Sequence, residues 1–179
     1  MQLIFYTLLN MKNTKTIRQY LGILAAIVAY FLVHEGAHMI YALCIGVFKN
    51  VRFMGIGMQI EVMSELMSDT QIGVFCLVGA LATLIVGWAL IPLSKHICKS
   101  ESKIFKSCMY YVSIAMLLID PLYLSVLYSL FGGGDMNGIS LIIPELAARI
   151  SFALLLVLNA VLFWKLLLPV YKKAFESEQ

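Results

Sequence analysis

The stretch Phe31-Leu-Val-His-Glu-Gly-Ala-His-Met-Ile40 decides which fold this chain can adopt. It places two histidines and a glutamate inside a run that is otherwise apolar. A charged side chain at the centre of a membrane-spanning helix costs about 2.5–3.5 kcal/mol on insertion scales. Ionisable residues at such positions are therefore candidates for function.

The composition around this stretch is that of an integral membrane protein. Of the 179 residues, 61% are hydrophobic and 13% are charged, and the mean hydropathy is +0.91. Soluble domains are closer to half apolar and a quarter charged. The length suits one compact bundle in a lipid bilayer. The net charge of +3 is small and the basic residues form no single patch, so nucleic acid is not expected as a partner.

Four segments are long and apolar enough to span a bilayer, which takes about 20 mostly apolar residues. They cover Tyr20–Val47, Ile72–Leu93, Cys108–Phe131 and Ile150–Val170. We therefore predict an all-α integral membrane protein with about four transmembrane helices, held in one domain over residues 20–170. Residues 1–19 are expected to be a cytoplasmic or interfacial segment, and residues 171–179 a cytoplasmic tail.

The basic residues are distributed unevenly between the two ends of these segments, and such a bias sets orientation. Ten of the thirteen lie before the first segment, between the second and third, or at the C-terminal end. Only Lys49, Arg52 and Arg149 lie on the opposite side. We expect both termini to face the cytoplasm, and we expect the membrane to be a bacterial cytoplasmic membrane.

The residues His34-Glu35-Gly-Ala-His38 fit the pattern HExxH. On a helix, residues four apart lie on one face, so both imidazoles can bind one metal ion, and imidazole with carboxylate suits Zn2+. Glu35 projects about 100° around the helix, on the flank of that face. It can serve there as general base toward a water molecule that the metal activates. The alternative is a structural histidine pair, hydrogen-bonded to a neighbouring helix.

A catalytic zinc site usually has three protein ligands and an open position for water. His34 lies about 14 residues into its segment, which is roughly 21 Å at 1.5 Å per residue and falls in the outer half of the bilayer. Asp135 follows the third segment at that outer end, after a run of glycines, and is the first choice for the third ligand. Asp120, nearer the middle of the same segment, is the second choice. His96 lies on the cytoplasmic side.

Residues Phe53–Val62, between the first two segments, alternate between large apolar side chains and smaller or polar ones. A period of two predicts a strand or a short hairpin. Its backbone groups must be paired, because open ones are expensive at a membrane. The acidic residues in and after it are interpreted as a solvated loop: Glu61, Glu65 and Asp69.

Taken in order, these features resemble the site-2 protease family of intramembrane zinc metalloproteases. The second span carries Val78-Gly-Ala-Leu-Ala-Thr-Leu84, which is similar to the family's small-residue span. The family has the pattern Asn-Pro…Leu-Asp-Gly, where this chain has Asp120-Pro121 and then Gly134-Asp135-Met-Asn-Gly138. The aspartate matches and its neighbours differ. The resemblance covers most of residues 20–140 and indicates a minimal or divergent member.

The resemblance implies hydrolysis of a peptide bond in or near a transmembrane segment of a membrane-anchored protein, as in regulated intramembrane proteolysis. His34, His38 and Asp135 would hold Zn2+, and Glu35 would activate the water. The strand would pair with an unwound substrate by β-augmentation. The competing hypothesis is a non-proteolytic membrane protein that binds or transports metal. Such a site needs no carboxylate beside its first histidine, so Glu35 favours catalysis.

Overall fold

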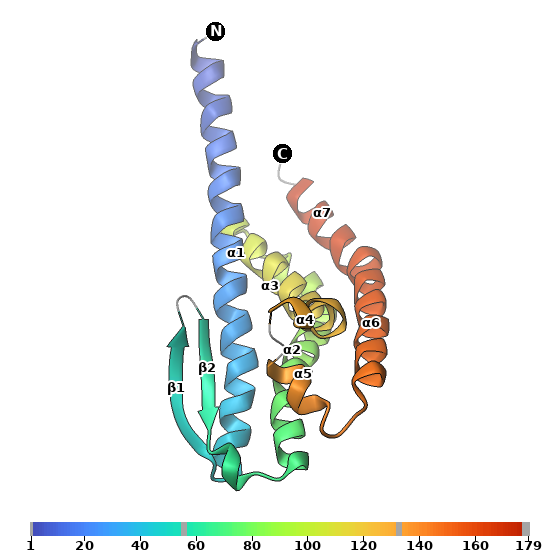
Figure 1. Cartoon of the computed structure of the whole chain (residues 1–179). Coiled ribbons are helices and arrows are strands. Elements are labelled where there is room, and N and C mark those ends of the chain that lie inside the picture. The colour runs from blue at the N-terminus through green and yellow to red at the C-terminus, as the bar shows by residue number, and fades with distance from the viewer. Residues whose placement is uncertain (1, 55–56, 132–133, 177–179) are drawn as a thin grey trace.

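Four long apolar helical segments and one hairpin make up this protein in its computed structural model. The segments long and apolar enough to cross a membrane are Lys15–Cys44, Asp69–Ile97, Lys103–Leu130 and Glu145–Glu176. A two-strand hairpin follows the first helix (Figure 1). The predicted fold class is confirmed. The structure describes residues 2–54, 57–131 and 134–176, with the side chains of 15–53, 57–130 and 134–176.

The helices account for most of the chain. They are α1 (Gln2–Cys44), α2 (Asp69–Ile97), α3 (Lys103–Leu122), α4 (Tyr128–Phe131), α5 (Gly134–Ile139), α6 (Glu145–Leu162) and α7 (Leu168–Glu176). The 3-10 turn η1 (Ser64–Leu66) lies between the hairpin and α2, and two π-helical turns, η2 (Tyr123–Leu127) and η3 (Phe163–Leu167), join helices. The two π-helical turns continue α3 into α4 and α6 into α7.

The first helix is longer at its start and shorter at its end than predicted. Residues 2–19 are helical and continuous with the rest of α1, because no glycine or proline interrupts them. At the other end α1 stops at Cys44, before the predicted limit of Val47. Gly46 has a φ of 75°, and the N–H groups of Gly46 and Val47 bond back to the carbonyls of Leu43 and Ala42. This Schellman motif ends the helix.

The other helix limits also differ from the predicted spans. α2 begins at Asp69, earlier than Ile72, because Ser68 and Gln71 form a capping box. α7 continues to Glu176, so most of the predicted tail over 171–179 is helical. An ion pair of 3.8 Å between Lys172 and Glu176, one turn apart, supports that last turn.

The segment predicted as one strand or a hairpin is a hairpin. β1 (Phe48–Met54) pairs antiparallel with β2 (Gly57–Val62), with Val51 opposite Ile60. Residues 55–56 of the predicted strand lie outside the described residues. β2 lies against α1, and β1 lies on the outer side of β2 (Figure 1).

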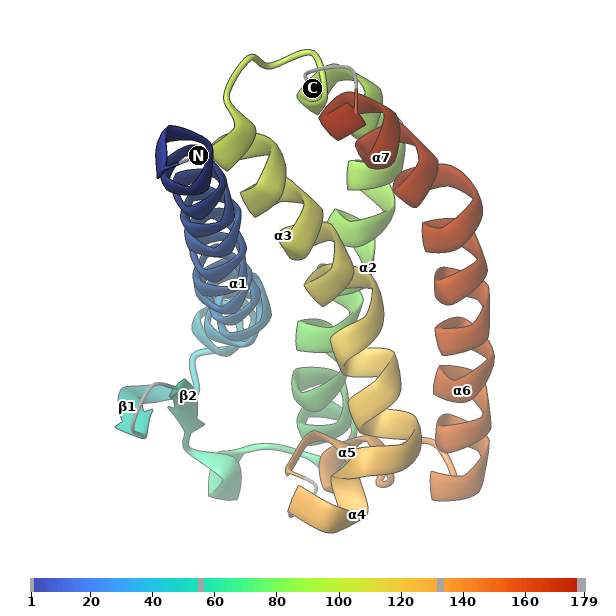
Figure 2. The same ribbon diagram turned by 90° about the horizontal axis from the view of Figure 1, so that it is seen from above.

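The two ends of the bundle carry different elements. The hairpin, α4 and α5 gather at one end, and the chain termini lie at the other, while α2, α3 and α6 run side by side (Figures 1 and 2). The Ser107 hydroxyl near the start of α3 donates to the Arg18 carbonyl of α1, at 3.1 Å. The segments that carry most of the basic residues therefore meet at the end with the termini. Which end faces the cytoplasm stays a prediction.

Candidate metal centre

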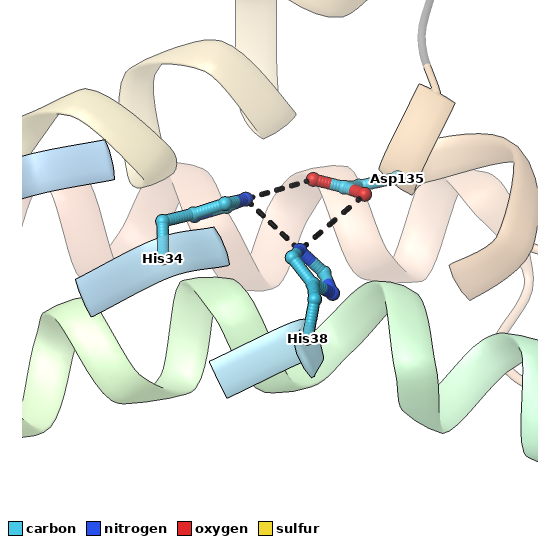
Figure 3. A group of neighbouring side chains, drawn as sticks. All are labelled: His34, His38 and Asp135. Atoms are coloured by element: carbon cyan, nitrogen blue, oxygen red, sulfur yellow. Dashed lines mark hydrogen bonds and ion pairs between the residues drawn. The ribbon is translucent and has the colours of Figure 1, made fainter. Parts of the chain in front are cut away.

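The helix α1 places the two histidines of the HExxH motif one turn apart on the face directed toward α2. Both are buried: His34 is 6% exposed and His38 is 3% exposed. Their Nε2 atoms lie 3.1 Å apart. Figure 3 shows the two rings turned toward each other and toward Asp135, which comes from a separate helix.

Asp135 stands in the first turn of α5 and completes the group. Its Oδ2 lies 3.2 Å from His34 Nε2, and its Oδ1 lies 3.9 Å from His38 Nε2. The three ligand atoms lie within 4.8 Å of one another, so this mostly buried group can hold a metal ion. The structure thus brings Asp135, the first choice for the third ligand, beside the two histidines.

The short helix α5 is held in place by its contact with α2. Met136 and Ile139 are fully buried and pack with Cys76 of α2. Gly138 lies so close to the Cys76 side chain that a Cβ at this position would overlap it. The lack of a side chain at this glycine lets α5 and α2 approach each other closely. That approach brings Asp135 down to the histidines.

The partner of Nδ1 in each histidine determines whether Nε2 carries a hydrogen or a lone pair. His38 Nδ1 donates to the Phe75 carbonyl oxygen at 2.7 Å, because a carbonyl can only accept. His34 Nδ1 lies 3.3 Å from the carboxylate of Asp120. In neutral rings, both Nε2 atoms therefore present lone pairs to each other and to Asp135. Three electron-pair donors directed at one point fit a bound cation.

Asp120, the second choice for the third ligand, lies outside this group. It is 1% exposed and contacts His34 on the Nδ1 side of the ring, away from His38 and Asp135. The hydroxyls of Tyr30 and Thr83 donate to it. Within the described residues, His96 and the acidic residues Glu61, Glu65 and Asp69 belong to no group of this kind.

Glu35 lies beside the group of His34, His38 and Asp135, called the metal group below, and does not belong to it. Its Oε2 accepts a hydrogen bond of 3.1 Å from the backbone N–H of Ile60 on β2. Glu35 also lines a cavity of about 520 Å³, together with His34 and Asp135. The remaining wall is mainly aromatic and aliphatic side chains of α1, α3 and η2. A carboxylate, a group that can hold a metal ion and a largely apolar space therefore adjoin one another.

Several contributors to the site are missing from the sequence-based prediction. Tyr30 lies one turn before His34, and this spacing of four residues is a usable signal. Thr83 lies in the small-residue span and has no such signal. The Phe75 carbonyl and the Ile60 N–H are main-chain groups, so no residue type reports them.

The chain matches no known protein-family model, and neither a curated protein nor a solved structure matches it. Fold alone does not define activity, and function must therefore be inferred from the site itself.

Proposed function

We propose that this protein is an intramembrane zinc metalloprotease, similar to the site-2 proteases, that hydrolyses a peptide bond in or near a transmembrane segment of a membrane-anchored substrate. The observation that carries the proposal is the convergence of two imidazole Nε2 atoms and the Asp135 carboxylate, with Glu35 beside them at a cavity. We further propose a bacterial cytoplasmic membrane as its location, with both termini in the cytoplasm.

The ligand set suits catalysis as well as binding. His34, His38 and Asp135 would hold Zn2+ and leave a position open, as catalytic zinc sites do. A zinc ion held there would supply Lewis acidity, which would activate water and polarise a peptide carbonyl. Because Asp135 comes from α5 and the histidines come from α1, a metal ion held there would also tie two distant parts of the chain together.

Glu35 is suited to the role of general base. It accepts a proton from water as the water oxygen attacks the carbonyl carbon, and it returns that proton to the amine nitrogen as the C–N bond breaks. The Ile60 N–H binds Oε2 and so holds the carboxylate in one orientation. The neighbouring cavity leaves space beside Glu35 for the substrate.

The edge of β2 that faces α1 is suited to an extended substrate. The Ile60 N–H points away from β1, toward Glu35, and Met58 is two positions along the same strand. In an antiparallel pair, alternate residues direct their N–H and C=O groups to the same edge, so Met58 also points away from β1. Glu35 takes the Ile60 N–H, so an unwound substrate segment would add to this edge at Met58 by β-augmentation, next to the general base.

The competing function is metal binding or transport without proteolysis. A conducting path needs free polar groups through the bundle, yet the buried hydroxyls of Ser94 and Ser113 donate to carbonyls of their own helices. Glu35 is outside the metal group, where a transport site gains nothing from it. Both features favour hydrolysis.

The decisive experiment compares wild type with Glu35→Gln in detergent micelles. Zinc content is measured in the purified proteins, and cleavage is followed by mass spectrometry on a panel of single-span membrane peptides. We expect the variant to retain zinc and lose cleavage. Glu61→Gln is the matched control, since Glu61 lies one residue from Ile60 and pairs with Arg52 instead. Wild-type protein without zinc, or a Glu35→Gln variant that still cleaves, would contradict the proposal.

A further inference from the structure

We propose that Asp120 is a positioning residue for the metal site: its carboxylate sets the tautomer and the orientation of the His34 imidazole, and hydroxyls from α1 and α2 hold that carboxylate in place. The inference rests on the metal site of the proposed function. Asp120 contacts His34 on the Nδ1 side of the ring, and it contacts neither the Nε2 side nor Asp135.

The geometry between Asp120 and His34 is close to symmetric. His34 Nδ1 lies 3.3 Å from Oδ1 and 3.3 Å from Oδ2, so the ring nitrogen faces the open edge of the carboxylate. A carboxylate can only accept from such a partner, and Nδ1 therefore carries the hydrogen. The lone pair is then on Nε2, which lies 3.1 Å from His38 Nε2 and 3.2 Å from Asp135.

Two hydroxyl donors fix the carboxylate itself. The Tyr30 hydroxyl donates to Oδ1 at 2.6 Å, and the Thr83 hydroxyl donates to Oδ2. The Tyr30 ring also stacks on the His34 ring, with centroids 5.3 Å apart and planes 26° apart. The imidazole is thus held at its face by Tyr30 and at its edge by Asp120.

Burial makes these contacts necessary. Asp120 is 1% exposed within the apolar span Lys103–Leu130, where a carboxylate without partners is expensive. Three donors from two other helices meet it there: Tyr30 and His34 from α1, and Thr83 from α2. Carboxylates that bind the second nitrogen of a ligating histidine orient the ring and raise its basicity. Both effects favour metal binding by Nε2.

The two histidines are held by different means, which makes the inference testable. His38 Nδ1 is held by the main-chain carbonyl of Phe75, which no substitution removes. His34 Nδ1 is held by a side chain. Changes at Asp120 should therefore act through one of the two imidazoles only.

The test measures zinc affinity by chelator competition on the purified full chain in detergent micelles. Asp120→Asn keeps the size of the side chain and removes its charge, and we expect zinc to bind about 10- to 100-fold more weakly. Tyr30→Phe and Thr83→Val each remove one donor to the carboxylate, and we expect smaller losses of severalfold. The ligand-field spectrum of the Co2+-loaded protein should shift in Asp120→Asn as well.

The matched control is Asn159→Leu. Asn159 is another fully buried polar residue, but it joins α6 to Trp88 and Leu117, away from the site. Its loss should lower stability and leave zinc affinity and the Co2+ spectrum unchanged. A merely structural role for Asp120 predicts this same outcome for Asp120→Asn.

Folded Asp120→Asn protein with wild-type zinc affinity would overturn the inference. If that variant does not fold, Tyr30→Phe and Thr83→Val decide, and unchanged affinity in both would overturn it equally. The outcome is separable from the proposed function. Wild type that binds zinc and cleaves nothing contradicts the protease and leaves the role of Asp120 standing. Wild type that binds zinc and cleaves, with zinc affinity unchanged in Asp120→Asn, supports the protease and overturns the role of Asp120.

Discussion

Gly79 on α2 lies directly against the imidazole of His38. A Cβ built on Gly79 would stand 2.5 Å from His38 Nε2 and 2.8 Å from His34 Nε2, closer than real Cβ atoms come to a neighbour. The absence of a side chain here is what lets both rings lie between α1 and α2.

The first prediction concerns this contact. Gly79→Ala should displace the imidazoles and weaken zinc binding by about tenfold or more, since metal sites need ligands held to about 0.5 Å. The helix should persist, because alanine favours it. Zinc affinity by chelator competition and helicity by circular dichroism check both statements. Unchanged affinity would mean that the rings do not need this space.

Two other glycines serve as controls for that substitution. A Cβ at Gly36, inside the HExxH motif, meets nothing within 4 Å, so Gly36→Ala should leave zinc affinity unchanged. A Cβ at Gly87, also on α2, would lie 2.9 Å from the Leu117 side chain. Gly87→Ala should therefore lower stability by about 1–3 kcal/mol through overpacking, with no effect on zinc.

The second prediction separates Asp135 from the remaining histidine of the chain. Asp135→Ala removes one of three converging ligands and should abolish stoichiometric zinc binding at micromolar zinc. Added zinc should raise the melting temperature of wild type, because a ligand that binds only the folded state stabilises it, and should not raise that of the variant. His96→Ala should behave as wild type in both assays. Equal loss in the two variants would place the site elsewhere.

The third prediction concerns the edge of β2. Met58→Pro removes an N–H that points away from β1, so the β1–β2 ladder keeps its bonds while a substrate strand loses a donor. We expect cleavage to fall severalfold with zinc still bound. Met58→Ala, which keeps the N–H, should cleave normally. If Met58→Pro cleaves as wild type does, substrate does not add to this edge.

The fourth prediction concerns packing far from the site. Asn159 on α6 donates to the Leu117 carbonyl at 2.7 Å and accepts from the Trp88 indole at 2.9 Å. Asn159→Leu loses both bonds and should lower the free energy of unfolding by about 1 kcal/mol, in the range of hydrogen bonds between membrane helices. Thermal unfolding in micelles measures this. A stability equal to wild type would show that α6 is held by apolar contacts alone.

Much of the architecture follows from properties of neighbouring residues. The four apolar runs predict four helices, because a bilayer demands about 20 apolar residues in sequence. The spacing of His34 and His38 predicts one shared face, because the helical period is a local property. The alternation over 53–62 predicts extended structure for the same reason. Limits such as Cys44 depend on backbone bonds around Gly46, which are harder to infer from residue type.

The partners of each ring nitrogen were decided only by tertiary structure. Asp120 and Asp135 lie 86 and 101 positions after His34. No local feature of the sequence indicates which ring nitrogen of His34 each carboxylate contacts. The close approach of α5 to α2 at Gly138 brings Asp135 to Nε2, and the packing of α3 against α1 brings Asp120 to Nδ1. The sequence by itself determined that these polar residues are present in apolar helices. The ring nitrogen that each carboxylate contacts was decided by the packing of those helices, because a contact between distant segments depends on their shape and not on residue spacing.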